Sequence, residues 1–334
     1  MVRSAAVTVG AVALALALAA CSPGGQMPAA SSSSPTAETT AASASATPSP
    51  SPSTATAAAT SFFADPYQQT LLDNATSPDD RALLTVLADT PTATWLTGGE
   101  WDATTLERVV TGAAAAGQTA VVVLYNIPNR DCGNYSAGGT TVEEYLPWVR
   151  QIDAQLHGDV WVILEPDALT GATCGDVAQR YRLLHDAGVI LRGSGHRVYL
   201  DAGHSNWLAA SDLADRLHQV GADAFDGISL NVSNFETTSD NVAYAREVSA
   251  AFGAPLHVVV DTSRNGNGPT PDHEWCNPPG RALGEPPRVV ADGTLDALLW
   301  IKTPGRSDGT CEGGPTAGAF WLPYALGLAR SAHW

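Results

Sequence analysis

The stretch Val160-Trp-Val-Ile-Leu-Glu-Pro-Asp167 contains the pattern that decides the fold of this chain. Five apolar residues end abruptly in the charged turn Glu165-Pro-Asp167. A short run that is apolar at every position is typical of a strand buried on both faces, as in a parallel sheet covered by helices. The acidic residues that follow it then stand at the carboxyl end of the strand.

The same pattern recurs along the chain. Further apolar runs lie at 93–96, 120–127, 198–200, 227–232, 256–260 and 297–301. Stretches of helical character lie between them, at 103–117, 141–156, 175–193, 208–221 and 238–252. Alternation of strands and helices predicts βαβ units and an α/β protein with a parallel sheet. Seven such strands favour a closed or nearly closed β/α barrel of the TIM type, with a doubly wound open sheet as the alternative.

The first 20 residues are typical of an export signal. Arg3 precedes an apolar run at 7–20, which is too short to span a bilayer. The run ends in Leu18-Ala-Ala-Cys21, which resembles the bacterial lipobox, in which the cysteine is acylated. We therefore expect export and anchoring through Cys21 to the outer face of the cell membrane. The alternative is ordinary signal cleavage and secretion, with a cysteine there by chance.

Residues 21–60 are predicted to be a disordered linker. They are almost wholly Ser, Thr, Ala and Pro, with Glu38 as the one charge, so they cannot bury enough apolar surface to fold. Residues 61–334 remain, and without an internal repeat or second linker they predict a single catalytic domain of barrel size.

Charge and cysteine content narrow the function. The formal net charge of −17 argues against a basic groove for nucleic acid. Four cysteines besides Cys21 in an exported chain predict two disulfides, for which three pairings exist. We favour Cys132–Cys174 and Cys276–Cys311, because each would join neighbouring loops. A zinc site is the alternative, although no C-x-x-C spacing occurs.

Polar and charged side chains follow six of the predicted strands. They include the acids Asp131, Asp167, Asp201 and Asp308, the bases Arg130, Arg264 and Lys302, and also His204 and Asn234. The carboxyl ends of parallel strands meet at one rim, which is where β/α folds build their active sites. Paired carboxylates with separated pKa values hydrolyse glycosidic bonds. The alternative is that the clustered carboxylates bind Mg²⁺ or Ca²⁺. Nearby Arg and Lys argue against it, because they would offset the repulsion between the acids and compete with a metal cation.

Three tryptophans fall in polar contexts near the predicted strand ends. Trp95, Trp207 and Trp275 predict stacking on pyranose rings, with core packing as the alternative for each one. Other hydrolase classes find less support. There is no G-x-S-x-G elbow, and the stretch Asn265-Gly-Asn-Gly268 lacks the features of a phosphate loop.

The chain resembles glycoside hydrolase family 6, the inverting cellulases. The matching stretches are 125–132, 164–167, 199–204 with Trp207, 231–234, 261–268, 275–284 and 302–311. They cover nearly the whole domain in order. The resemblance implies a distorted seven-stranded barrel, a β-1,4-glucan substrate, and neither metal nor cofactor. It also matches the cysteine pairing favoured above.

Roles for single residues follow from the resemblance. It implies that Asp167 is the general acid, that Asp131 raises the pKa of the acid and joins a water chain, and that Asp308 is the base or stabilises it. Asp201 would hold the distorted sugar, and Tyr125 would line that subsite. Arg130 and Arg264 would balance the charge of Asp131. Glucosyl units would be bound by Trp95, Trp207, Trp275, His204, Asn234 and Lys302.

Two local features refine the expected activity. Only 11 residues separate Asp308 from Phe320, too few to roof the site, so we expect an open cleft and internal cutting. Arg306 stands where the family often has Glu, which puts in doubt how substrate is gripped around Lys302. The expected protein is a monomeric endo-β-1,4-glucanase. The alternatives are an anchored glucan-binding protein without activity, an exo-acting cellobiohydrolase, and a metal-dependent hydrolase.

Overall fold

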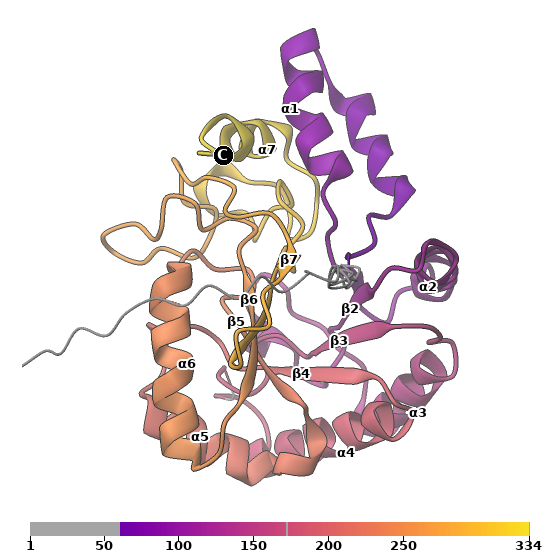
Figure 1. Cartoon of the computed structure of the whole chain (residues 1–334), viewed down its shortest axis with the longest axis vertical. Helices are drawn as coiled ribbons and strands as arrows, with labels where there is room; N and C mark the ends of the chain where they lie inside the picture. The colour runs from indigo at the N-terminus through magenta and orange to yellow at the C-terminus, as the bar shows by residue number, and fades with distance from the viewer. Residues whose placement is uncertain (1–60, 172, 334) are drawn as a thin grey trace, which may run out of the picture. The chain divides into compact units, whose positions relative to one another are not determined.

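The computed structural model describes residues 61–171 and 173–333. The predicted signal at 1–20, the linker at 21–60 and the lipidation site Cys21 lie outside these residues. The described chain forms an α/β domain whose strands and helices alternate, as Figure 1 shows. None of its helices is both long and apolar enough to cross a membrane.

One sheet of eight strands lies at the centre of the domain. Seven parallel strands are β1 Thr94–Leu96, β2 Ala120–Leu124, β3 Val160–Leu164, β4 Arg197–Asp201, β5 Gly227–Leu230, β6 His257–Asp261 and β8 Leu295–Leu299. The short strand β7, Arg288–Val289, pairs antiparallel with β8 and was not predicted. The spatial order β1-β2-β3-β4-β5-β6-β8-β7 shows no reversal among the parallel strands. The doubly wound alternative is therefore wrong.

The sheet curls, but its two parallel edges do not join through a ladder. In the described residues β1 pairs only with β2, and β8 pairs with β6 and β7. The Ala93 N–H still donates to the Trp300 carbonyl at 2.9 Å, and Trp95 Nε1 donates to the Ile301 carbonyl at 2.8 Å. The sheet is thus an incomplete barrel, and the seven-stranded TIM-like description is approximate.

Helices cover the outer face of the sheet. The five that were predicted are α2 Asp102–Ala116, α3 Val142–Asp153, α4 Val177–Gly193, α5 Ala210–Val220 and α6 Thr238–Phe252. Each follows one of the strands β1 to β5 in the chain. Side chains of Thr141, Asp176 and Thr237 cap α3, α4 and α6 by accepting backbone N–H bonds. The ends of all five helices agree with the predicted ranges to within three residues.

Further helical elements form a separate hydrophobic cluster. They are η1 Pro66–Asn74, α1 Pro78–Asp89 and α7 Leu322–Arg330, none of which was predicted, and α1 packs against α7. The short 3-10 turns η2 Asp131–Gly133, η3 Ala222–Ala224 and η4 Cys311–Gly313 complete the set.

Side chains alternate across the parallel strands and build two layers of core. On β2, Val122 and Leu124 pack toward the helices, whereas Val121, Val123 and the following Tyr125 lie in the inner cluster. Both faces are apolar, which explains the continuous apolar run. The filled interior leaves the carboxyl ends of the strands as the place where polar groups can reach solvent.

Candidate active site

A cleft of about 490 Å³ opens at the carboxyl ends of the strands. It is lined by eleven of the predicted site residues: Trp95, Tyr125, Arg130, Asp131, Asp167, His204, Trp207, Asn234, Trp275, Lys302 and Asp308. Asp201 and Arg264 are buried behind this lining. Sequence positions more than 200 residues apart therefore meet at one rim, as the alternation of strands and helices predicted.

Asp167 lies in the turn that follows β3. Glu165 and Asp167 both adopt left-handed backbone conformations, with φ of 48° and 68°, on either side of Pro166. Such conformations cost free energy in residues other than glycine and occur most often at functional sites. Burial, with added repulsion from Asp131, raises the pKa of Asp167 to about 7, so a proton is retained near neutral pH.

Asp131 lies one loop away, after β2, and its backbone φ is 57°. Its Oδ2 accepts the Ser136 N–H at 2.7 Å. Arg130 was expected to balance Asp131, but it contacts Tyr125 instead. Its guanidinium lies 4.7 Å from the centre of the Tyr125 ring, and its Nη1 donates to the Tyr125 carbonyl at 2.6 Å. Arg130 therefore holds Tyr125, which lines the cleft.

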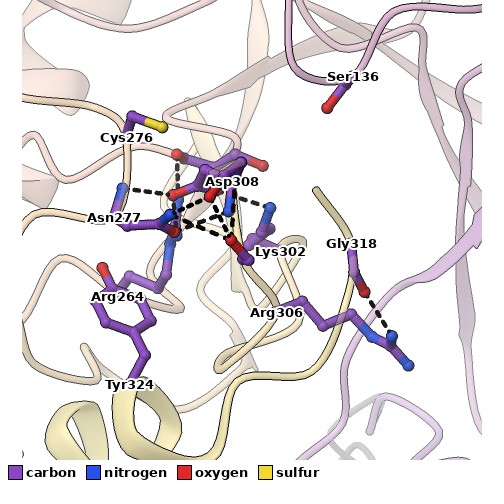
Figure 2. A network of polar contacts seen from close by, with 12 residues as sticks. Ser136, Arg264, Cys276, Asn277, Lys302, Arg306, Asp308, Gly318 and Tyr324 are labelled. Atoms are coloured by element: carbon purple, nitrogen blue, oxygen red, sulfur yellow. Dashed lines mark hydrogen bonds and ion pairs between the residues drawn. The ribbon is translucent and has the colours of Figure 1, made fainter. Parts of the chain in front are cut away.

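Asp308 is held by two cations, as Figure 2 shows. Lys302 Nζ lies 2.8 Å from one carboxylate oxygen, and Arg264 Nη1 lies 2.7 Å from the other. Burial alone would raise the pKa of Asp308, but the charges of Arg264 and Lys302 outweigh it and lower the pKa below the ordinary value. The expectation that Arg264 balances Asp131 is corrected: its ion pair is with Asp308. Asp308 therefore stays ionised.

Asn277 completes the surroundings of Asp308. Its N–H donates to the Asp308 carboxylate at 3.1 Å, and its side-chain oxygen accepts the Asp308 N–H at 2.8 Å. The prediction missed this residue, although it lies inside the quoted stretch at 275–284. A neutral amide next to a half-cystine gives no signal of its own in a single sequence.

Asp201 lies behind Asp167 and does not reach the cleft. Its side chain is buried and accepts the Asp167 N–H at 2.9 Å, the Gly203 N–H at 3.2 Å and the Ser229 hydroxyl at 3.2 Å. Burial and the nearby Asp167 raise its pKa well above the ordinary value. Instead of touching sugar, as expected, Asp201 holds the backbone of Asp167.

Two tryptophans present exposed faces along the cleft. Trp207 and Trp275 are 40% and 47% exposed, which suits them to stack on a sugar ring. His204 lies beside Trp207, with ring centres 5.3 Å apart. Burial, with a smaller effect of His273, lowers the pKa of His204 to about 4, so the ring is neutral near neutral pH. His273 also lines the cleft and was not predicted.

Arg306 points away from the cleft. Its Nη1 donates to the Gly318 carbonyl at 2.8 Å, as seen in Figure 2, and it is absent from the cleft lining. It brings no charge next to Lys302 there. The grip around Lys302 is therefore determined by Asp308 rather than by Arg306.

Both favoured disulfides are present. Cys132–Cys174 joins the loops that follow β2 and β3, and Cys276–Cys311 joins the loops around Trp275 and Asp308. The zinc alternative for these cysteines is therefore wrong. Among the described residues no group of three or more His, Cys, Asp or Glu side chains is arranged to hold a metal ion.

An acid of raised pKa, further carboxylates and exposed tryptophans in one cleft form the kind of site with which glycoside hydrolases work. The chain belongs to the glycosyl hydrolases family 6, whose family model matches residues 54–332.

Individual relatives agree with this membership. The chain is 47% identical over 283 residues to "Endoglucanase A" of Cellulomonas fimi, covering 82% of this chain and 62% of that protein. It is 40% identical over 279 residues to "Endoglucanase 1" of Streptomyces halstedii, covering 78% and 85%. The solved endoglucanase Cel6 of Mycobacterium tuberculosis, in complex with methyl-cellobiosyl-4-deoxy-4-thio-β-D-cellobioside, superposes with a TM-score of 0.76. That pair is 42% identical, with 82% and 98% of the two chains covered.

Proposed function

We propose that this protein is an inverting endo-β-1,4-glucanase that hydrolyses internal bonds of cellulose or a related soluble β-glucan. One observation carries the proposal: Asp167, with a pKa of about 7, shares a cleft with the carboxylates Asp131 and Asp308. A retained proton on one acid beside an ionised carboxylate, here Asp308, is the arrangement that glycoside hydrolysis requires. The substrate class comes from the names of the bacterial relatives.

The proposed steps assign one task to each acid. Asp167 gives its proton to the oxygen of the leaving sugar while water attacks the opposite face of the ring. Asp131 is exposed to the cleft and receives the proton of that water directly or through a second water. Asp308, ion-paired with Arg264 and Lys302, is the weaker proton acceptor, and its negative charge offsets those two cations near the sugar, on which positive charge develops. Neither metal nor cofactor enters these steps.

The remaining lining residues bind the chain. Trp207 and Trp275 stack on glucosyl units, and Trp95 forms the wall next to Tyr125, with ring centres 5.2 Å apart. His204, Asn234 and Lys302 supply hydrogen bonds to sugar hydroxyls. In this proposal Asp201 acts only through Asp167.

Internal cutting is favoured over cutting from chain ends. The loop between Asp308 and Phe320 is short, which favours an open cleft over a roofed one. The relatives named endoglucanases are 47% and 40% identical, whereas a probable exoglucanase of Podospora anserina is 30% identical.

Export and anchoring complete the proposal. The apolar run at 7–20 and Cys21 support attachment of a monomer to the outer face of the membrane, with 21–60 as a spacer. Radiolabelled palmitate should enter the protein in its bacterial host. The Cys21→Ala variant should be released and remain unlabelled, whereas labelling of that variant would contradict the anchor.

The central test is Asp167→Asn on carboxymethylcellulose. We expect reducing-sugar release to fall at least about 1,000-fold, because the proton donor is lost, while glucan binding remains. NMR of early products should show α-anomers from β-bonds. Viscosity should fall sharply per bond cut, as it does for internal cleavage. Asp223→Asn, a change of the same chemistry at an exposed position, is the control and should match the wild type. Binding without hydrolysis by the wild type would instead establish a glucan-binding protein.

A further inference from the structure

The turn that carries the acid needs support from its neighbours. Glu165 and Asp167 both occupy left-handed backbone conformations and flank a proline, so the turn is strained on its own. On one side Asp201 of β4 accepts the Asp167 N–H at 2.9 Å. The other side faces the segment after β2, and there the contact is made by Glu165.

Glu165 is fully buried and does not line the cleft. Its Oε2 accepts the Asn126 N–H at 3.0 Å and the Ile127 N–H at 3.1 Å, and its Oε1 lies 3.1 Å from the same Asn126 nitrogen. Those amides lie four and five residues before Asp131. One side chain therefore joins the turn of the acid to the segment of its acidic neighbour.

Other contacts extend the connection. The Glu165 N–H donates to the Leu124 carbonyl at 2.9 Å, the last residue of β2, and the Thr140 N–H donates to the Asn126 carbonyl at 3.0 Å. The loop that bears Asp131 is thus tied to the strand ends from both of its sides. Without an acceptor at Glu165, two buried N–H groups would lose their partners, and the segment would have to move to find others.

A purely packing role does not explain a carboxylate here. Burial raises the pKa of Glu165 to about 7, so the ionised group is disfavoured at this position relative to water. An apolar side chain would fill the volume without that cost, but it could not accept the two N–H groups. The acceptor geometry, rather than the volume, therefore explains the residue.

We propose that Glu165 is a positioning residue that sets the separation between Asp167 and Asp131 by fastening the turn of the one to the segment of the other. This inference rests on the proposed function of those two acids. A shift on the order of 1 Å between reacting groups lowers rates about 100-fold, so the fastening matters for turnover.

The test compares three substitutions of Glu165. Glu165→Ala removes the acceptor, and Glu165→Asp withdraws it by one methylene. Both should lower kcat on a soluble cello-oligosaccharide roughly 10- to 100-fold, with KM changed less than about twofold. Glu165→Gln keeps one oxygen in the Oε2 position and should retain about a third or more of the wild-type kcat. Asp80→Ala, which removes a buried acid far from the cleft, is the control and should leave kcat unchanged.

A second readout reports position directly. In Glu165→Ala the Asp131 charge should act on Asp167 from farther away, so the pKa of Asp167 should fall and the basic limb of the pH–rate profile should move to lower pH. Carbon-13 NMR of labelled aspartates, with Asp167→Asn for assignment, measures that pKa without any substrate. If Glu165→Ala and Glu165→Asp fold and leave both kcat and the pKa unchanged, the proposal is wrong. An inactive wild type would overturn the proposed function while this titration still decides the role of Glu165.

Discussion

At the scale of single residues, the site separates its acids by their surroundings. Asp167 lies among apolar and acidic neighbours and retains its proton, whereas Asp308 lies between Arg264 and Lys302 and loses it. The same residue type therefore adopts opposite protonation states in one cleft. Which acid keeps its proton is determined by residues that lie far apart in the sequence.

The raised pKa of Asp167 predicts the basic limb of the activity profile. As pH rises through about 7, the proton needed by the leaving group is lost, and kcat should fall about tenfold per pH unit. Initial rates on carboxymethylcellulose between pH 5 and 9 measure this, with circular dichroism to verify folding at each pH. Activity that is constant to pH 9 would exclude Asp167 as the acid.

The pocket of Asp308 predicts a large cost in stability. In Asp308→Asn the buried Arg264 and the partly buried Lys302 lose their counter-charge, so the free energy of unfolding should fall by about 3–5 kcal/mol. Urea denaturation followed by tryptophan fluorescence measures it. The exposed pair Glu285–Arg288 provides the control, since Glu285→Gln should cost less than about 1 kcal/mol. A cost for Asp308→Asn no larger than that control would contradict the buried pair.

At the scale of elements, the two disulfides join the loops that form the cleft. Cys132 directly follows Asp131, and Cys276 lies between Trp275 and Asn277. Each bond therefore constrains a loop that carries acid or stacking groups. They close segments with sequence separations of 42 and 35 residues.

Removing either disulfide should destabilise the domain by about 4 kcal/mol, because loops of this length gain much entropy in the unfolded chain. The paired variants Cys132→Ser with Cys174→Ser, and Cys276→Ser with Cys311→Ser, test this in urea. The second pair should also lower kcat, since Asn277 adjoins Cys276 and holds Asp308. If the variant without Cys276–Cys311 keeps the kcat of the wild type, the Asp308 loop holds its shape without the bond.

The sequence was sufficient for the elements with a strong period. Strands buried on both faces have continuous apolar runs, and the five covering helices fill the intervals between these runs, so their existence could be predicted. α1 and α7 could not, because they pack on each other beside the barrel, outside the strand–helix alternation. β7 has only two residues and depends on pairing with β8.

The site was predictable as a set of residues but not as a set of contacts. The rim residues follow strand ends, so eleven of them could be placed in one cleft. That Arg264 pairs with Asp308, and that Asp201 and Glu165 bind backbone amides, depends on side-chain directions and local backbone conformation. Those are properties of the folded rim, and no spacing in the sequence encodes them.

At the scale of the whole molecule, buried acids give stability an unusual pH dependence. The folded pKa of Glu165 is about 7, above the value of about 4.3 for an unfolded glutamate. The folded state then holds more protons, so this contribution is complete below about pH 4 and is lost as pH rises through 7. Asp308 acts oppositely, because its lowered pKa stabilises the fold above the unfolded pKa and the effect is lost on acidification.

Glu165→Gln should therefore reduce the loss of stability between pH 5 and 8, since the group no longer titrates. Urea midpoints of the wild type and this variant at the two pH values give the comparison. If the urea midpoint changes equally between the two pH values in the wild type and in the variant, Glu165 is already ionised in the folded protein at pH 5, and the prediction is wrong.

The incomplete closure of the sheet has a mechanical consequence. At the seam between β1 and β8, the described hydrogen bonds are the Ala93–Trp300 backbone bond and the Trp95–Ile301 bond, whereas other neighbouring strands share several backbone pairs. The barrel is thus closed at this seam by fewer hydrogen bonds than elsewhere, and thermal opening of the sheet should begin there. Trp95 and Lys302 lie beside this seam, and Lys302 Nζ is 2.8 Å from the Asp308 carboxylate, so opening there would also shift an acid of the cleft.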